Sequence, residues 1–117
     1  MRFFAVLALA CLAGCASTPQ DLRGTGVRTD HTLTLPVDQA AGCLARNTEN
    51  NSWLYAATTR PMPGGIFEVI VRMPEAPIFG AMYLIEVTPA GTSSKASIWG
   101  PTPGGEGNYR SEVIKGC

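Results

Sequence analysis

The sequence has little of what metal centres are usually built from. It contains a single histidine, His31, and four cysteines among 117 residues. A zinc site combines several His, Cys or carboxylate ligands at close spacing, and no such grouping stands out. We therefore predict no metal site and no cofactor.

Charge is also sparse and balanced, with nine basic against nine acidic residues. A near-neutral chain has no electrostatic footprint for nucleic acid and no polybasic arm for anionic lipid. We therefore exclude nucleic acid as a partner.

Combinations of residues that support catalysis are missing as well. Asp30 precedes His31, but neighbouring side chains on an extended chain point in opposite directions, so the carboxylate would not orient the imidazole. The hydroxyls of residues 92–94 have no histidine base nearby in the sequence. The glycine clusters at 63–65 and 104–107 are not followed by the lysine and hydroxyl residue of a phosphate-binding loop. We predict that the protein is not an enzyme.

What the sequence does contain is an apolar N-terminal run. Arg2 is followed by ten uncharged, mostly aliphatic residues, 3–12. This length suits the core of a signal peptide and is too short for a membrane-spanning helix. The run ends in Leu12-Ala13-Gly14-Cys15.

This ending resembles the lipobox of bacterial lipoprotein precursors. The resemblance implies that residues 1–14 are a signal peptide cut before Cys15. It also implies that the Cys15 thiol receives diacylglycerol and that the new amino group is acylated, for example with palmitate. Two or three acyl chains are enough for stable attachment to a membrane. The alternative is an ordinary secretory signal that happens to contain Cys15.

The residues after the cysteine bear on sorting. In Gram-negative lipoproteins an aspartate at this position tends to retain the protein in the inner membrane. Ala16 and Ser17 stand here instead. For a Gram-negative host, the resemblance therefore implies an outer-membrane lipoprotein that faces the periplasm.

Small, polar and turn-prone residues dominate the next segment. We predict a lipidated flexible tether over residues 15–35, which includes His31 and adds a short strand at 32–35. The folded domain is expected over residues 36–117. Loss of Arg2 with the signal leaves eight basic and nine acidic residues.

The domain's pattern predicts an α+β fold. A helix should begin near Pro36 and end in the polar cluster 47–52. Four strands should follow at 53–59, 66–73, 81–88 and 94–99, with breaks at 60–65, 74–80, 89–92 and 100–107. A short helix capped by Asn108 should cover 109–113. We expect a small antiparallel meander with the N-terminal and C-terminal helices on one face.

Two cysteines remain once Cys11 is removed with the signal and Cys15 carries lipid. In an oxidising compartment, Cys43 and Cys117 are expected to form a disulfide. The alternative is two free thiols. Closing a loop of roughly 75 residues would add about 4 kcal/mol in the chain-entropy model, which matters for a domain of only about 80 ordered residues.

The second face of the sheet is the candidate binding face. One face carries Phe67, Val69, Val71 and Met73 with Ala81, Tyr83, Ile85 and Val87. The opposite face then carries Ile66, Ile70, Met82 and Leu84, joined by Trp99 or Trp53. Apolar residues there would form either a recognition surface or a patch covered by the tether or the final segment. Glu68, Arg72, Glu86 and Lys95 would be its polar rim or cross-strand charges that keep the sheet soluble.

These features favour a non-enzymatic, membrane-anchored periplasmic lipoprotein that binds an envelope protein or serves as a structural accessory. The alternative is a small-ligand or cell-wall-glycan binding module that stacks sugars on Trp53, Trp99 and Tyr83. A role like that of the periplasmic lysozyme inhibitors belongs to this alternative, by analogy of size and location alone.

Overall fold

The computed structural model describes residues 18–51, 54–76, 80–101 and 109–117. The predicted signal peptide, the lipobox, Cys15, Trp53 and the predicted cap Asn108 lie outside these residues. The fold below is that of the described residues.

The described chain is an α+β domain, as predicted, but its sheet has five strands where about four were expected. All neighbouring strands are antiparallel, and their order is β1-β5-β4-β3-β2. The strands from β2 to β5 form the expected meander, and β1 adds to its β5 edge. The elements are, in chain order, α2 (Pro19–Thr25), β1 (Val27–Leu33), α3 (Val37–Asn51), β2 (Ala56–Met62), β3 (Ile66–Arg72), β4 (Ala81–Ala90), β5 (Ser93–Gly100) and α4 (Tyr109–Val113).

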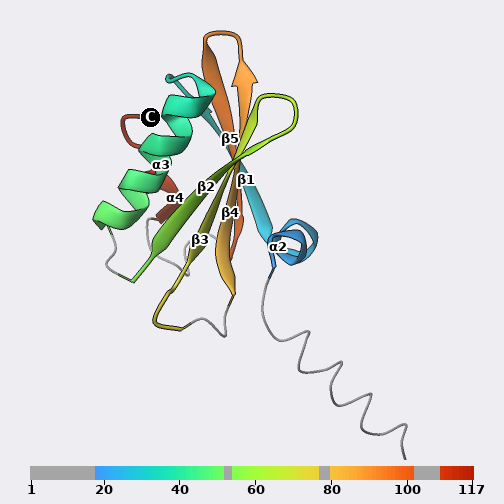
Figure 1. Ribbon diagram of the computed structural model, residues 1–117, viewed down its shortest axis with the longest axis vertical. Helices are drawn as coiled ribbons and strands as arrows, with labels where there is room; N and C mark the ends of the chain where they lie inside the picture. Colours follow the sequence, from blue (N-terminus) through green and yellow to red (C-terminus); the bar gives the residue numbers. More distant parts are fainter. Residues whose placement is uncertain (1–17, 52–53, 77–79, 102–108) are drawn as a thin grey trace, which may run out of the picture.

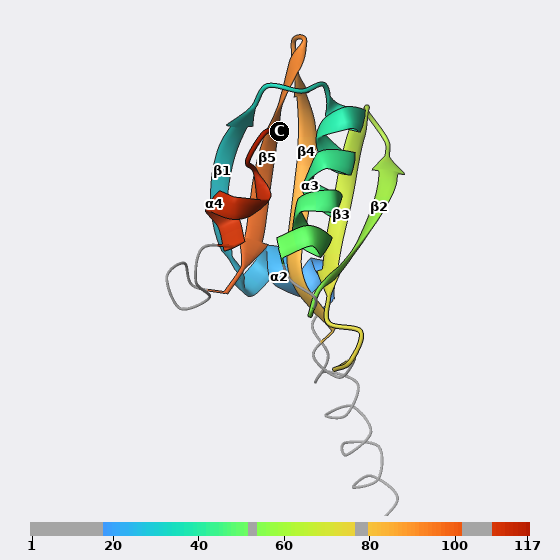
Figure 2. The same cartoon turned by 90° about the vertical axis from the view of Figure 1, so that its left-hand side faces the viewer.

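The helices divide between the two faces of the sheet. Helices α3 and α4 lie on one face, and α2 lies on the other (Figure 1). Figure 2 looks onto the α3 face, with β1 and β2 at the two edges and α2 at the lower end. The predicted helices are thus both on one face, and α2 is an additional helix opposite them.

The main core lies between the sheet and the α3–α4 layer. Ala40 and Leu44 of α3 and Val113 of α4 pack against buried strand residues. Every second position of β3 and β4 contributes, because successive side chains of a strand alternate between its faces. The strand residues are Leu33, Val69, Val71, Tyr83, Ile85, Val87, Ala96 and Ile98.

The predicted tether is wrong from residue 18 onward, because α2 and β1 occupy most of this segment. Strand β1 pairs with β5 along its whole length, from Val27 opposite Gly100 to Leu33 opposite Ser94. Its polar composition reflects its position at an edge, where one side of the strand has no neighbour and charged side chains discourage further pairing. The domain therefore begins near Thr18 and not at Pro36.

Helix α3 runs to Asn51, through the polar cluster that was expected to end it near Asn47. Asn47 and Thr48, the first two residues of this cluster that lie in the helix with described partners, are satisfied without breaking it. Thr48 Oγ1 donates to the Leu44 carbonyl, and Asn47 Nδ2 donates to the carbonyls of Val113 and Lys115.

In the part of the chain that the structure describes, no helix is long and apolar enough to cross a membrane.

Strand β2 also differs from the prediction, since it continues through Arg60 and Pro61 to Met62. Proline has no N–H to donate, so it is accepted in a sheet at an edge. β2 is such an edge strand, and Pro61 lies opposite Phe67 of β3. The turn that follows uses Gly64 and Gly65 at positive φ, which favours glycine.

The predicted disulfide is present. Cys43 of α3 is bonded to Cys117, 74 residues later. The carbonyl of Cys117 also accepts hydrogen bonds from the backbone N–H groups of Thr34 and Leu35. The last residue is thereby tied both to α3 and to the chain that leaves β1.

Candidate functional site

The candidate binding face lies on the α2 side of the sheet, and it is covered. Ile70, Leu84 and Trp99 stand side by side on β3, β4 and β5. They are only 6 %, 0 % and 8 % exposed, because Leu22 of α2 packs with them. The recognition-surface prediction is therefore wrong for these residues. The other reading holds: part of the segment predicted to be a tether covers them.

Met82 does not belong to this face. The register between β3 and β4 shifts between Val71 and Arg72: Val71 lies opposite Tyr83, whereas Arg72 lies opposite Ala81. The skipped residue, Met82, packs against the main core, and Ala81 joins the apolar cluster under α2. A bulge of this kind adds one residue to a strand and re-aims its neighbours, which simple alternation cannot anticipate.

Helix α2 begins with a capping box, a local sequence signal that the predicted tether does not account for. Thr18 Oγ1 accepts from the Asp21 backbone N–H, and Asp21 Oδ2 accepts from the Thr18 N–H, at 3.1 and 3.0 Å. Pro19 occupies the first helical turn, where its missing N–H costs nothing. The pattern of a capping threonine followed by a carboxylate three residues later could have identified both α2 and its buried Leu22.

Beside the apolar cluster, a row of ion pairs crosses the same face. Arg23 of α2 lies 2.8 Å from Glu68 Oε2 and 3.2 Å from Glu86 Oε2. Arg60 of β2 lies 2.7 Å from Glu68 Oε1, although these atoms are not aligned for a hydrogen bond. Glu68 and Glu86 are direct cross-strand partners, and like charges in that position repel. Arg23 therefore neutralises a repulsive pair.

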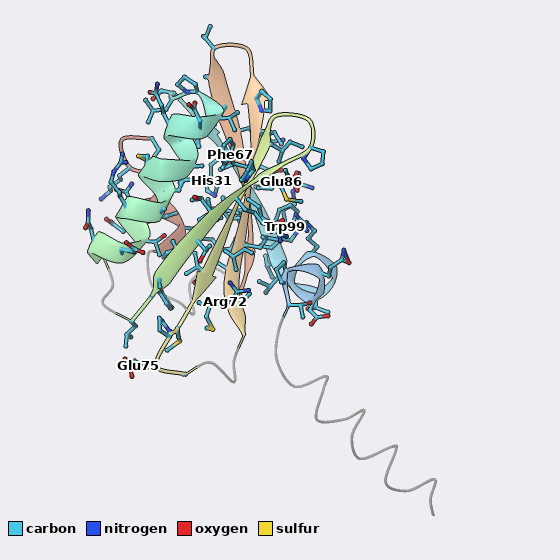
Figure 3. The ribbon with its side chains drawn as sticks, viewed as in Figure 1. His31, Phe67, Arg72, Glu75, Glu86 and Trp99 are labelled. Atoms are coloured by element: carbon cyan, nitrogen blue, oxygen red, sulfur yellow. A yellow bond between two sulfur atoms is a disulfide. The ribbon has the colours of Figure 1, made fainter. Side chains whose placement is uncertain are left out.

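This arrangement decides between the two readings for Glu68. Glu68 is completely buried, so it is not part of an exposed rim. Its ion pairs span α2, β2 and β3. Lys95 pairs across strands with Asp30 at 4.0 Å, in line with the reading of cross-strand charges. Figure 3 shows Glu86 and Trp99 on the α2 side of the sheet.

Two arginines cover Trp99. The guanidinium carbons of Arg23 and Arg28 lie 5.7 and 5.2 Å from the centre of its ring. Such contacts are favourable because the ring face carries partial negative charge. Trp99 is thus enclosed by Leu22, Arg23 and Arg28, and little of its ring is available to a ligand.

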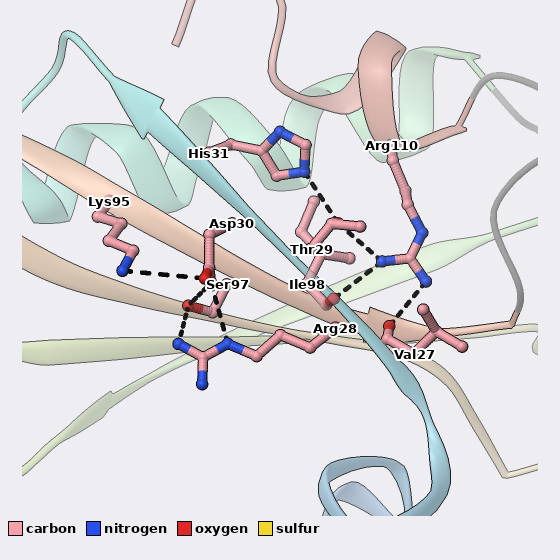
Figure 4. A network of polar contacts seen from close by, with 9 residues as sticks. All are labelled: Val27, Arg28, Thr29, Asp30, His31, Lys95, Ser97, Ile98 and Arg110. Atoms are coloured by element: carbon pink, nitrogen blue, oxygen red, sulfur yellow. Dashed lines mark hydrogen bonds and ion pairs between the residues drawn. The ribbon is translucent and has the colours of Figure 1, made fainter.

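Asp30 and His31 diverge from β1, as the alternation of side chains predicted (Figure 4). Asp30 Oδ1 accepts from Ser97 Oγ at 2.7 Å and from Arg28 Nε at 2.9 Å. These hydrogen bonds, with the positive charges of Arg28 and Lys95, lower the pKa of the Asp30 carboxyl. The group is held as a carboxylate in a structural cluster on the α2 face.

His31 lies on the opposite side of β1, within a strand and not in a tether. Its Nε2 is 3.0 Å from Thr29 Oγ1. Burial, and next the positive charge of Arg110, lower the pKa of His31, while Asp30 raises it. The surroundings of the imidazole therefore favour its neutral form.

Arg110 is the central cation of this second cluster. It donates to Thr29 Oγ1 and to the carbonyls of Ile98, Val27 and Pro101, at 2.7–3.0 Å. Its guanidinium also lies 5.8 Å from the centre of the Tyr83 ring. These bonds join α4 to β1 and β5, a role in holding the fold together.

The aromatic residues proposed for sugar stacking are not exposed where the structure describes them. Tyr83 is fully buried, and it packs with Tyr55 and Tyr109, whose ring centres lie 6.1 and 4.1 Å away. Trp99 is enclosed as described, and Trp53 lies outside the described residues. The glycan-binding alternative thus loses two of its three stacking surfaces.

Comparison with known proteins adds no functional assignment, since no protein-family model, curated protein or solved structure matches this chain. Among the described residues, no three His, Cys, Asp or Glu side chains are grouped so that they could hold a metal ion.

Proposed function

We propose that the protein is a lipid-anchored, non-enzymatic envelope protein whose small domain binds another envelope protein or serves as a structural accessory. The observation that carries the proposal is the sequence Leu12-Ala13-Gly14-Cys15 after an apolar run. For a Gram-negative host, Ala16 favours the outer membrane, with the domain in the periplasm.

Two properties of the domain support the proposal. The Cys43–Cys117 disulfide supports a location outside the cytoplasm, since such bonds persist in oxidising compartments. The engagement of the Glu68 and Asp30 carboxylates in the fold supports a non-enzymatic role. Glu68 is held by two arginines, and Asp30 by Arg28 and Ser97.

The edges of the sheet favour recognition through side chains. Pro61 interrupts the hydrogen-bonding edge of β2, and Arg28 and Asp30 place charges along β1. Proline and charge at an edge both oppose the addition of another strand. A partner protein is therefore expected to contact the side chains of exposed surfaces, not to extend the sheet.

Mass spectrometry of the mature N-terminus tests the anchor. The protein purified from membranes should begin at Cys15, with a diacylglyceryl thioether and an acylated amino group. The Cys15→Ser variant should keep its signal sequence and lack lipid. A mature chain that begins elsewhere, or a Cys15 without lipid, would overturn the proposal.

Photo-crosslinking in cells tests partner binding. A photoreactive amino acid is placed at Gln39 on α3 or at Thr58 on β2, both exposed. One position should give a discrete product with a single envelope protein, and the product should disappear when the chain is expressed without its membrane anchor. If neither position gives a product, protein binding through these surfaces is contradicted.

A further inference from the structure

We propose that the α2 end of the domain lies directly against the lipid surface, so that the turns at the opposite end point away from the membrane. This inference rests on the proposed lipidation of Cys15. It replaces the predicted flexible tether over residues 15–35, which would leave the domain free to turn relative to the membrane.

The first step is the length of chain between the lipid and the fold. Only Ala16 and Ser17 separate Cys15 from Thr18. Three peptide links of about 3.8 Å each span about 11 Å at most. The capping residue of α2 must therefore lie within about 11 Å of the lipidated cysteine's backbone.

The second step is that Thr18 is fixed to the sheet through α2. The capping box joins Thr18 to Asp21, Leu22 is buried against Trp99, and Arg23 is paired with Glu68 and Glu86. Gly26, just after the helix, approaches so closely that a Cβ there would stand 2.5 Å from the Leu22 carbonyl oxygen and 3.2 Å from the Gly100 nitrogen. A short link to a helix attached this firmly restricts how the whole domain can turn.

The third step is the position of α2 in the molecule. It lies at the end of the sheet where β1 begins at Val27 and β5 ends at Gly100. Figures 1 and 2 show it at the lower end, with the β4–β5 turn at the upper end. Figure 3 places Arg72 and Glu75, from the end of β3 and just beyond it, at the same lower end.

The surface at this end has a property that suits lipid. Val27 and Leu54 are the large hydrophobic residues that stand out as exposed in the described part of the chain, at 39 % and 37 %. Val27 begins β1, and Leu54 comes just before β2, whose first residue lies opposite Arg72 at the end of β3. Both therefore lie at the α2 end of the sheet. A single exposed apolar residue is ordinary, but both mark the end that the anchor brings to the bilayer.

The consequence concerns what a partner can reach. The turns at Gly64–Gly65 and Gly91–Thr92 and the start of α3 lie at the far end of the sheet. A protein that meets this domain from the periplasm would contact that end first.

Depth-dependent quenching tests the orientation on the mature, lipidated protein in vesicles of phosphatidylethanolamine and phosphatidylglycerol with a nitroxide on some headgroups. A fluorophore is attached to Gly24→Cys on α2 or to Thr92→Cys in the β4–β5 turn. The introduced cysteine is the one free thiol, because Cys15 carries lipid and Cys43 is bonded to Cys117. The cysteine at position 24 should be tolerated, because a Cβ there meets nothing within 4 Å. A label at Gln20→Cys, an exposed position on the same helix, provides a second variant.

Quenching should be several-fold stronger at positions 24 and 20 than at position 92. A Gly/Ser insertion of about ten residues between Ser17 and Thr18, with a root-mean-square span of about 17 Å, should abolish most of this difference. Equal quenching at both ends of a protein shown to carry lipid would overturn this inference alone. Mass spectra without lipid on Cys15 would overturn the proposed function and this inference together.

Discussion

The two faces of the sheet are held by different physical means. The α3 face is a continuous apolar core, with a helix of 15 residues, a disulfide and a cluster of three tyrosines. The α2 face has a helix of seven residues that buries one leucine and places one arginine over two glutamates. A helix this short is unstable alone, so α2 depends on Leu22 and Arg23.

The two faces should therefore respond differently to substitutions. Packing and a covalent bond hold the α3 face, whose disruption should weaken the whole domain. Ion pairs and one small apolar cluster hold the α2 face, whose disruption should release α2 first. The following changes act on one face at a time.

The largest effect is expected from removing the disulfide on the α3 face. The double variant Cys43→Ala/Cys117→Ala should lower the free energy of unfolding by about 4 kcal/mol, from the loop it closes. Urea denaturation with and without reductant measures the loss. Reductant should destabilise the parent protein and leave the variant unchanged. An unchanged unfolding midpoint in the double variant would contradict this account.

A smaller loss in the free energy of unfolding is expected from Gly100→Ala, which acts on the same face. A Cβ at this position would stand 2.4 Å from the Tyr83 ring, and Tyr83 is buried among other aromatic residues. Overpacking of this kind costs about 1–3 kcal/mol. Gly24→Ala on α2 is the matched control. A Cβ there meets nothing within 4 Å, and alanine is more favourable than glycine inside a helix by about 1 kcal/mol. Thermal unfolding should separate the two variants in opposite directions.

The α2 face should respond more weakly to Arg23→Met. We expect a loss of about 1 kcal/mol, because Arg23 is partly exposed and Arg60 still pairs with Glu68. Arg28→Met is a comparison variant that removes the other cation over Trp99 together with the bonds to Asp30 and Ser97, and leaves Glu68 untouched. If Arg23→Met is as stable as the parent protein in denaturation, the contact with the glutamates adds nothing.

A double variant isolates that contact. With Glu68→Gln the charge that Arg23 neutralises is gone, so adding Arg23→Met should cost less than it does in the parent. Additive losses in this cycle would mean that Arg23 acts through Trp99 or Leu22 and not through the ion pair.

The smallest effect is a pH dependence from His31. The fold keeps its imidazole neutral at pH values where the unfolded chain is protonated, since its pKa is lowered by burial and by Arg110. Its contribution to stability is therefore complete above about pH 6.5 and is lost as the pH falls through the lowered pKa. His31→Gln should flatten the stability profile in that range. The pKa of Asp30 is also lowered, but Asp30 changes the stability only at more acidic pH, where its carboxylate becomes protonated.

Much of the α3 face could be predicted from the sequence. The spacing of Ala40, Ala41 and Leu44 identified α3, alternation in 66–73 and 81–88 identified β3 and most of β4, and elimination among the cysteines identified the disulfide. These are strong periodic or covalent signals. The limits of α3 and β2 were wrong, because Asn47 and Thr48 find partners in and near α4, and because Pro61 lies at an edge.

The α2 face could be predicted only in part. The sequence placed Ile70, Leu84 and Trp99 together and gave the tether as one possible cover. It did not identify the helix that covers them, because α2 has one apolar residue and no visible periodicity. Thr18 and Asp21 form a local capping signal that is easily lost in a polar segment. The bulge at Met82 depends on the pairing of two strands, which is a tertiary property. The anchor at Cys15 rests on the sequence alone.

Amide hydrogen exchange at α2 tests the central claim most directly, namely that this segment is part of the fold and closes the second face. The N–H groups of Leu22 and Gly26 donate to the carbonyls of Thr18 and Leu22. Both should exchange far more slowly than in an unfolded chain, and Arg23→Met should speed both while the β3 and β4 amides stay protected. Exchange at the rate of an unfolded chain in the parent protein would mean that residues 18–26 are a tether after all.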